Sequence, residues 1–117
     1  MSDITIYQKP TCSKCRETML LLKEQGVSFD AINYFIDPIP EATLTELVKK
    51  LGISPLDLFR KKEPKYRELG IGEKNLSDAE LIHLLAENPD LIERPIVVKG
   101  DRAVLGRPPE NVLKLFL

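Results

Sequence analysis

Residues 4–22 read ITIYQKPTCSKCRETMLLL and change their hydrophobic period part-way along. The first residues alternate apolar and polar side chains and include β-branched and aromatic types, which predicts a strand over residues 3–8. After the turn at Pro10, apolar residues recur at helical spacing from Ser13 onward, and Gly26 supplies a C-terminal stop. A strand followed directly by a helix is therefore expected.

A second strand follows this helix, and more strands are predicted near the end of the chain. Residues 27–35, VSFDAINYF, alternate apolar and polar side chains again, so strand, helix and strand form a βαβ unit with parallel strands. After Pro95, apolar runs at residues 96–98 and 103–106 flank the polar stretch KGDR, which predicts a hairpin. The segment PPENVLKLFL, residues 108–117, then predicts a final helix.

Between these two halves, residues 38–90 approximately predict a helical insert. Pro38 and Pro40 end the strand region. Helix starts follow at Thr43 with Glu46, at Ser54 before Pro55, and at Ser77 with Glu80. We therefore expect a single domain over residues 1–117. Its fold class is α/β, a thioredoxin-like fold with a small mixed β-sheet and a helical insertion between the βαβ and ββα halves.

The composition is that of an ordinary soluble globular protein. Apolar residues make up 43% of the chain and charged residues 30%, with a formal net charge of -1. These values exclude a disordered, fibrous or nucleic-acid-coating chain. The beginning of the chain lacks a basic segment followed by an apolar one, and no apolar run is long enough to cross a bilayer. We therefore expect a cytoplasmic monomer whose partners include neither nucleic acid nor a membrane.

Cys12 and Cys15 are the only cysteines of the chain. In a reducing cytosol such a pair favours redox, catalytic or metal chemistry over a permanent disulfide. A structural disulfide across so short a loop would stabilise the fold by only about 2 kcal/mol. A zinc site needs more ligands than His83, the only histidine, would add, so no metal is expected. A buried core position would suit Cys15 better than Cys12.

The surroundings of Cys12 favour a reaction centre. Cys12 lies at the start of the predicted helix, where unpaired backbone N–H groups and the helix dipole stabilise a thiolate. Lys14 and Arg16 add positive charge, which also lowers the pKa of a thiol. Cys15 lies one turn further along the helix, close enough to Cys12 for a disulfide if the geometry allows one.

Three arginines stand at the ends of predicted elements: Arg60, Arg94 and Arg107. Arg94 and Arg107 precede prolines, which favour an extended backbone at the residue before them. If the hairpin lies beside the first strand, both side chains could converge on Cys12. Guanidinium groups bind tetrahedral oxyanions and stabilise thiolates. Spacing alone leaves open that these are ordinary surface arginines.

The segments ITIYQKPTCSKCRETMLLL, LFRKKEPKYRELG, RPIVV and LGRPPENVLKLF resemble, in the same order, blocks of the glutaredoxin-linked arsenate reductase family. The resemblance implies a thioredoxin-like fold, a nucleophilic Cys12, a cis-proline at Pro95, and an oxyanion pocket made by Arg60, Arg94 and Arg107. It also implies that the Cys12 thiolate attacks arsenate and that water leaves. Glutathione, with the help of glutaredoxin, then completes the reduction to arsenite, and no cofactor is bound.

Two positions depart from the well-studied arsenate-reducing type. Those enzymes usually carry Ser where this chain has Cys15, and often His where it has Gln8. A second thiol one turn from Cys12 could resolve the modified Cys12 as an intramolecular disulfide, which thioredoxin or glutaredoxin would reduce. Without the histidine, the helix dipole and the arginines are left to ionise Cys12.

Two other functions stay open at this point. The CxxC pair also resembles the redox switch of Spx, a related family of transcription regulators that bind the α subunit of RNA polymerase. Gly52, at a predicted helix end, could belong to such a docking surface or could simply end the helix. Arg107, by contrast, follows the reductase pattern. The other alternative is a generic dithiol oxidoreductase whose arginines bind the carboxylates of glutathione.

Overall fold

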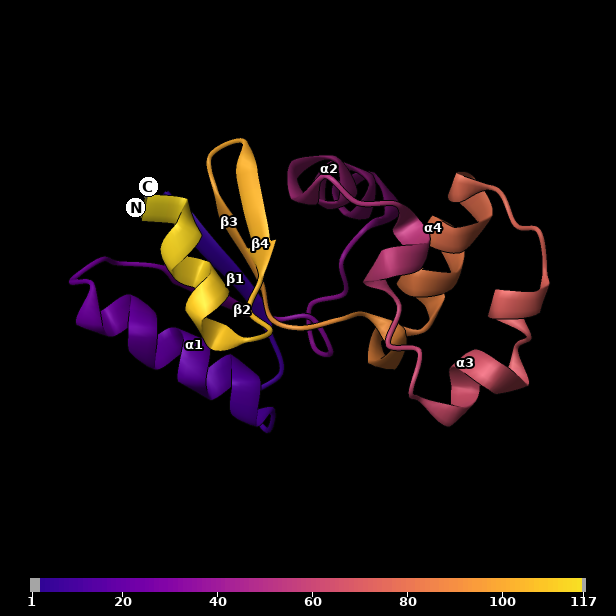
Figure 1. Ribbon diagram of the computed structural model, residues 1–117, viewed down its shortest axis with the longest axis horizontal. Helices are drawn as coiled ribbons and strands as arrows, with labels where there is room; N and C mark the ends of the chain where they lie inside the picture. Colours follow the sequence, from indigo (N-terminus) through magenta and orange to yellow (C-terminus); the bar gives the residue numbers. More distant parts are fainter. Residues whose placement is uncertain (1–2, 117) are drawn as a thin grey trace. The chain divides into compact units, whose positions relative to one another are not determined.

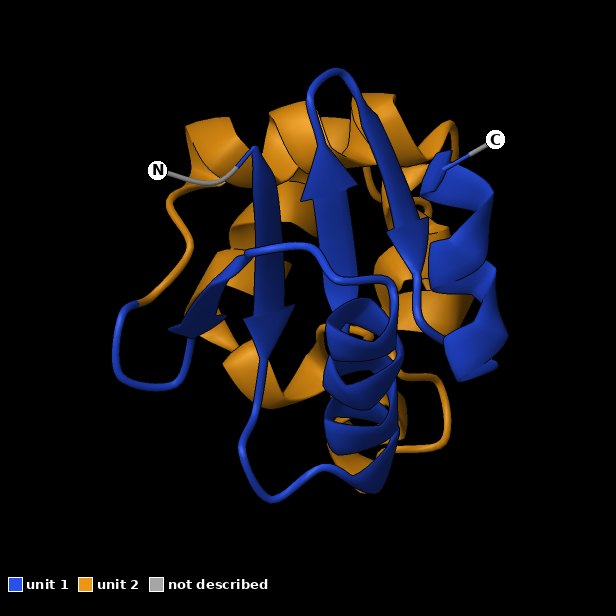
Figure 2. Ribbon diagram, turned by 90° about the vertical axis from the view of Figure 1, so that its left-hand side faces the viewer, with its two compact units in different colours: residues 1–37, 94–117 blue, residues 38–93 orange. Residues whose placement is uncertain are grey.

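The computed structural model describes residues 3–116, and Figure 1 labels its elements along the chain. The chain forms two compact units (Figure 2): unit 1 is Met1–Asp37 with Arg94–Leu117, and unit 2 is Pro38–Glu93. Unit 2 begins where the predicted insert begins and ends slightly later. That the two units act as a single domain stays a prediction.

Unit 1 is built on a four-stranded sheet with the strand order β2-β1-β3-β4. Its strands are β1 (Ile4–Gln8), β2 (Asp30–Asn33), β3 (Ile96–Lys99) and β4 (Arg102–Leu105). The β1 and β2 strands are parallel, whereas β3 runs antiparallel to both β1 and β4. This mixed sheet, with its βαβ and ββα halves, confirms the predicted thioredoxin-like fold class.

Two helices pack on one face of this sheet, α1 (Ser13–Glu24) and the 3-10 helix η4 (Pro109–Phe116) (Figure 2). The buried core between sheet and helices consists of Ile4, Ile6, Leu22, Val97, Val112 and Leu115. Since side chains alternate along a strand, Gln8 lies on the same face of β1 as Ile4 and Ile6. This core fixes the start of α1 beside the carboxyl end of β1.

Two elements of unit 1 differ from their predicted form. The β2 strand is shorter than the predicted residues 27–35, because only residues 30–33 pair with β1. The last helix has 3-10 geometry: the N–H of Asn111 donates to the carbonyl of Pro108, with 3.0 Å between N and O. Residue 117, the end of that predicted helix, lies outside the described residues.

Unit 2 is helical, as predicted. Its helices are α2 (Glu41–Leu51), η1 (Pro55–Leu58), α3 (Pro64–Glu68), η2 (Ile71–Glu73), α4 (Asp78–Glu87) and η3 (Pro89–Leu91), of which the η elements are short 3-10 helices. None of the helices within residues 3–116 combines the length and the apolar character that a bilayer-spanning segment needs.

The helix starts of unit 2 agree with the sequence at Ser54, the N-cap of η1, and at Ser77, and differ at Thr43. The capping box of α4 is confirmed: the Glu80 N–H donates to the Ser77 hydroxyl at 3.2 Å, and the Ser77 N–H donates to the Glu80 carboxylate at 3.1 Å. The predicted box at Thr43 is wrong, because α2 begins earlier, at Glu41. A carboxylate in the first turn favours that start through the helix dipole.

Candidate active site

Cys12 occupies the N-cap position of α1, at the helix start predicted from the sequence. Its N–H donates to the carbonyl of Lys9, with 2.9 Å between N and O, which closes the turn after β1. Its Sγ atom accepts a hydrogen bond from the N–H of Cys15, with 3.4 Å between N and Sγ. The helix start therefore presents a backbone donor directly to the sulfur.

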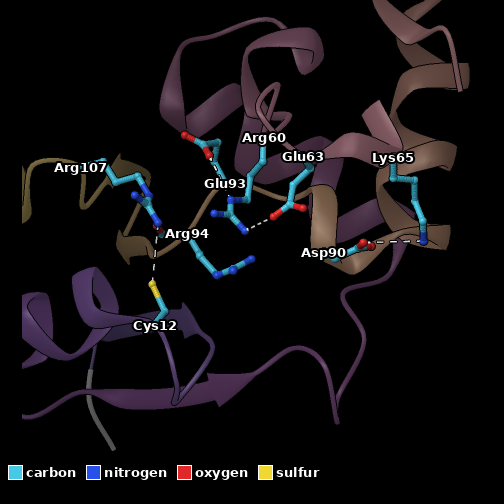
Figure 3. Close-up of polar contacts among 8 residues, drawn as sticks. All are labelled: Cys12, Arg60, Glu63, Lys65, Asp90, Glu93, Arg94 and Arg107. Atoms are coloured by element: carbon cyan, nitrogen blue, oxygen red, sulfur yellow. Dashed lines mark hydrogen bonds and ion pairs between the residues drawn. The ribbon is translucent and has the colours of Figure 1, made fainter. Parts of the chain in front are cut away.

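Arg107 approaches Cys12 from the loop that follows β4 (Figure 3). Its Nη2 atom lies 3.8 Å from Sγ of Cys12, and its Nε atom donates to the backbone carbonyl of Arg94 at 2.6 Å. The sheet accounts for this long-range contact, because β3 lies beside β1 and β4 lies beside β3. The structure thus brings Arg94 and Arg107 together at Cys12, as the position of each arginine before a proline suggested.

Arg94 precedes β3 and is 8% exposed. Its guanidinium is hydrogen-bonded to the side chains of Tyr34 and Cys12, and its Cζ atom lies 5.8 Å from the centre of the Phe35 ring. Among residues 3–116, neither Nε nor Nη1 of Arg94 has a hydrogen-bond partner. Buried donors are normally satisfied, so an anionic ligand beside Cys12 would complete this arrangement.

The pKa of the Cys12 thiol lies below its ordinary value. Burial by itself raises this pKa, but hydrogen bonds from the thiol and the N–H of Cys15 and from Arg94, together with the charge of Arg107, lower it by more. Cys12 therefore has the character of a nucleophile, because the thiolate is the reactive form.

Cys15 has the opposite character. The pKa of the Cys15 thiol is raised to about 12, and burial is the largest cause. The hydrogen bond to Cys12 and the charge of Cys12 act in the same direction, whereas the backbone N–H of Lys9 and the charge of Arg94 act against them. Cys12 and Cys15 are both free thiols in this structure. No three His, Cys, Asp or Glu side chains of residues 3–116 are grouped so that they could hold a metal ion.

The loop that carries Arg107 packs closely on its surroundings. The Arg94–Pro95 peptide bond is cis, as the resemblance implies, and so is the Arg107–Pro108 bond. The N–H of Gly106 donates to the carbonyl of Pro95 at 2.9 Å. A Cβ atom on Gly106 would lie 2.6 Å from Oγ1 of Thr18 and 2.7 Å from Cγ of Pro95. This position therefore has no room for a side chain.

Arg60, the third predicted pocket residue, belongs to unit 2. Its Nη1 atom lies 2.8 Å from a carboxylate oxygen of Glu63, and its Nε atom lies 3.7 Å from one of Glu93 (Figure 3). The N–H of Arg60 donates to the carbonyl of Leu91 at 2.7 Å. The surroundings of Arg60 within unit 2 are thus defined, and its place in the oxyanion pocket stays a prediction.

A sequence comparison matches the residues that form this site to a known family. The profile of the ArsC family matches residues 7–115, which include Cys12, Arg94 and Arg107. The chain belongs to the ArsC family.

The similarity of this ArsC-family chain to individual proteins extends over nearly its whole length. The uncharacterized protein YfgD of Escherichia coli is 47% identical over 97% of this chain and 96% of its own length. The arsenate reductase of Haemophilus influenzae is 41% identical over 97% of this chain and 99% of its own. The solved structure of an arsenate reductase from Vibrio cholerae is 44% identical, covers 95% of each chain and superposes with a TM-score of 0.91.

Two residues of this ArsC-family site were not predicted from the sequence. Tyr34 is fully buried and hydrogen-bonds to Arg94. The parallel pairing of β1 and β2 is a signal that could have found it, because Asn33 lies opposite Gln8 and Tyr34 follows at the same edge. The side chain of Asn111 hydrogen-bonds to the backbone of the Arg107 loop, and no sequence pattern predicts this contact.

The structure also describes Gly52, which bears on the regulator alternative, and Gln8, which departs from the arsenate-reducing pattern. Gly52 is the C-cap of α2, with a left-handed φ of 70°, and its N–H donates to the carbonyl of Val48 at 3.0 Å. This is the geometry of a helix stop. Gln8 is 6% exposed, and its Oε1 atom has no hydrogen-bond partner among residues 3–116.

Proposed function

We propose that this ArsC-family chain is a thiol-dependent oxidoreductase that reduces arsenate to arsenite. The observation that carries the proposal is the pairing of Cys12, whose pKa is lowered, with a guanidinium nitrogen of Arg107 at 3.8 Å. A thiolate beside cations can attack an oxyanion that those same cations bind. The relatives named arsenate reductase, at 41% identity in Haemophilus influenzae, support this substrate.

The arginines bind and orient arsenate in this proposal. Arg94 has two buried nitrogen donors without a partner among residues 3–116. A planar guanidinium suits two oxygens of a tetrahedral oxyanion, and its burial strengthens the attraction. Arg107 holds the thiolate and contacts the oxygens as they approach Cys12. Arg60 is the third proposed ligand of the oxyanion.

The first chemical step joins sulfur to arsenic. The Cys12 thiolate attacks arsenic, an As–S bond forms, and an As–O bond breaks. The departing oxygen takes up protons from solvent and leaves as water. Because this exchange of ligands transfers no electrons to arsenic, arsenic is still in its pentavalent state. The arginines stabilise the negative charge that accumulates on the remaining oxygens during the attack.

The second step transfers the electrons, and here we assign the attacking thiol to Cys15. Its sulfur attacks Sγ of Cys12, the S–As bond breaks, and the electron pair of that bond stays on arsenic. Arsenic becomes trivalent and leaves as arsenite, while the two thiols become a disulfide and Cys15 loses its proton. The charge of the Cys12 thiolate contributes to the raised pKa of Cys15, and the bond to arsenic removes that contribution.

The disulfide is then reduced by thioredoxin or glutaredoxin through thiol–disulfide exchange. In the alternative cycle, glutathione instead of Cys15 attacks the modified Cys12, and glutaredoxin reduces the resulting mixed disulfide. The two cycles differ in the role of Cys15, and the reductant requirement separates them.

The test is a coupled NADPH-oxidation assay with arsenate. One arm contains thioredoxin and thioredoxin reductase, and the other contains glutathione, glutaredoxin and glutathione reductase. We expect arsenate-dependent NADPH oxidation that Cys12→Ser abolishes, whereas Cys15→Ser retains activity only in the glutathione arm. Full turnover by Cys12→Ser would disprove the nucleophile. If the parent chain is inactive in both arms but captures the α subunit of RNA polymerase, the regulator alternative holds instead.

A further inference from the structure

The loop from Leu105 to Pro108 holds Arg107 in place, and its backbone carbonyls have an unusual partner. The Nδ2 atom of Asn111 lies 3.2 Å from the carbonyl oxygen of Leu105 and 3.0 Å from that of Arg107. The two hydrogens of one amide group thus join the residues on either side of Gly106. No residue with an assigned role in the site makes these contacts.

Asn111 is itself held firmly by the core. It lies in η4, immediately before Val112, which is fully buried in the core of unit 1. The backbone N–H of Asn111 donates to the carbonyl of Pro108 at 3.0 Å. The amide group therefore projects from a fixed backbone and ties the loop to the helix that follows it.

The other side of the loop is equally confined. Gly106 packs against Thr18 of α1 and against Pro95, at distances that exclude a Cβ atom. The Nε atom of Arg107 is held by the Arg94 carbonyl at 2.6 Å, and Nη2 reaches Cys12 at 3.8 Å. A small rotation of the loop backbone would therefore move the long Arg107 side chain away from the sulfur.

We propose that Asn111 is a positioning residue: by holding the carbonyls of Leu105 and Arg107, it keeps the Arg107 guanidinium in contact with Cys12. Asn111 touches neither the sulfur nor the proposed oxyanion, and it acts through Arg107 alone. The inference deepens the proposed function by naming a residue that sets the reactivity of the nucleophile. It concerns ionisation of the thiol, which is measured without arsenate.

The experiment measures the rate at which iodoacetamide alkylates Cys12 as a function of pH. All variants carry Cys15→Ser, so that Cys12 is the single thiol that can be alkylated. The midpoint of this profile follows the ionisation of Cys12. We expect Asn111→Ala to move the midpoint upward and to slow alkylation at about pH 6 by roughly three- to tenfold, because an opposite charge near a thiolate stabilises it.

A double-mutant comparison separates positioning from general loosening of the fold. If Asn111 acts through Arg107, then Asn111→Ala causes no further shift of the midpoint when it is added to Arg107→Ala. Asn88→Ala is a matched control, since Nδ2 of Asn88 also donates to a backbone carbonyl, that of Leu84 at 2.9 Å, but in unit 2. Asn88→Ala should leave the alkylation profile unchanged.

Asn111→Ser is the second variant, and it carries the test if Asn111→Ala does not fold. Its hydroxyl is a single donor for one of the two carbonyls, so a smaller upward shift is expected. An unshifted midpoint in the folded variant, or a full shift in the Arg107→Ala background, would overturn the proposal. Inactivity of the parent chain toward arsenate would count against the proposed function only, because alkylation requires no arsenate.

Discussion

The Nε atom of Arg107 lies 2.6 Å from the backbone carbonyl oxygen of Arg94, so the backbone of one site arginine orients the side chain of the other. The same guanidinium uses Nη2 to reach Sγ of Cys12. One planar group therefore makes both contacts, and this geometry is available to arginine but not to lysine.

Arg107→Lys is expected to impair the reaction although it preserves the charge. A single ammonium group cannot bridge the Arg94 carbonyl and Cys12 in the same way, so kcat/KM for arsenate should fall about 10- to 100-fold. Steady-state kinetics measure the change. The control is Arg102→Lys, because Arg102 donates to a backbone carbonyl, that of Lys114, at an exposed position. Equal effects of the two substitutions would contradict the bridging role.

Tyr34→Phe should weaken the binding of arsenate with little effect on the fold. The ring stays packed, but Arg94 loses its phenol partner, which costs about 1 kcal/mol for a lost hydrogen bond. We expect a raised KM for arsenate and a slightly lowered melting temperature. Tyr66→Phe is the control, since Tyr66 lies in unit 2, where its ring contacts Phe59. An unchanged KM for Tyr34→Phe would leave Tyr34 as a packing residue only.

Gly106→Ala should be costly because its Cβ atom has no room between Thr18 and Pro95. The loop must shift, and we expect a loss of about 1–3 kcal/mol in the free energy of unfolding, together with slower alkylation of Cys12. Gly72→Ala is the control, since its nearest contact would be the Tyr66 hydroxyl at 3.1 Å, a longer distance than the closest contacts at Gly106. Chemical denaturation measures the free energy of unfolding of both variants. A Gly106→Ala variant as stable as the parent would refute the close packing.

The buried thiol of Cys15 predicts a pH dependence of stability. Its pKa is raised from 9.0 to about 12 on folding, so the folded state favours the protonated form. This stabilisation is complete below pH 9.0 and is lost as the pH rises toward about 12. Cys15→Ala should therefore reduce the decline in the free energy of unfolding across this range. Parallel curves for parent and variant, measured by urea denaturation, would exclude the contribution.

Arg60→Ala tests the remaining predicted pocket residue. If Arg60 binds the oxyanion, KM for arsenate should rise at least about tenfold. Its ion pairs with Glu63 and Glu93 also disappear, so Glu63→Gln serves as a control that removes one pair and keeps the guanidinium. If both variants raise KM equally, Arg60 acts through the local fold of unit 2 and not as a ligand.

The sequence predicted the part of the site that depends on strong local signals. The change of hydrophobic period placed Cys12 at a helix start, and the prolines after Arg94 and Arg107 placed both arginines at element ends. The convergence of these residues then followed from strands that pair as a hairpin beside β1.

Other features depend on tertiary contacts that leave no local pattern. The early start of α2 at Glu41 competes with an equally plausible cap at Thr43, and propensity alone does not choose between them. The contacts of Tyr34 and Asn111 require the exact path of the backbone around Arg94 and Arg107. Their residue types are common at strand ends and in turns, so the sequence alone does not distinguish them.

The insertion of residues 38–93 within unit 1 has a consequence for the protein while it is being synthesised. Cys12 leaves the ribosome long before Arg94, Arg107 and the strands that carry them to it. A nascent chain that ends within unit 2 lacks β3, β4 and both guanidinium groups, so Arg94 and Arg107 cannot yet lower the pKa of its Cys12. The contribution of the two arginines to the reactivity of the nucleophile therefore arises only after the later part of unit 1 has been translated and has folded onto the earlier part.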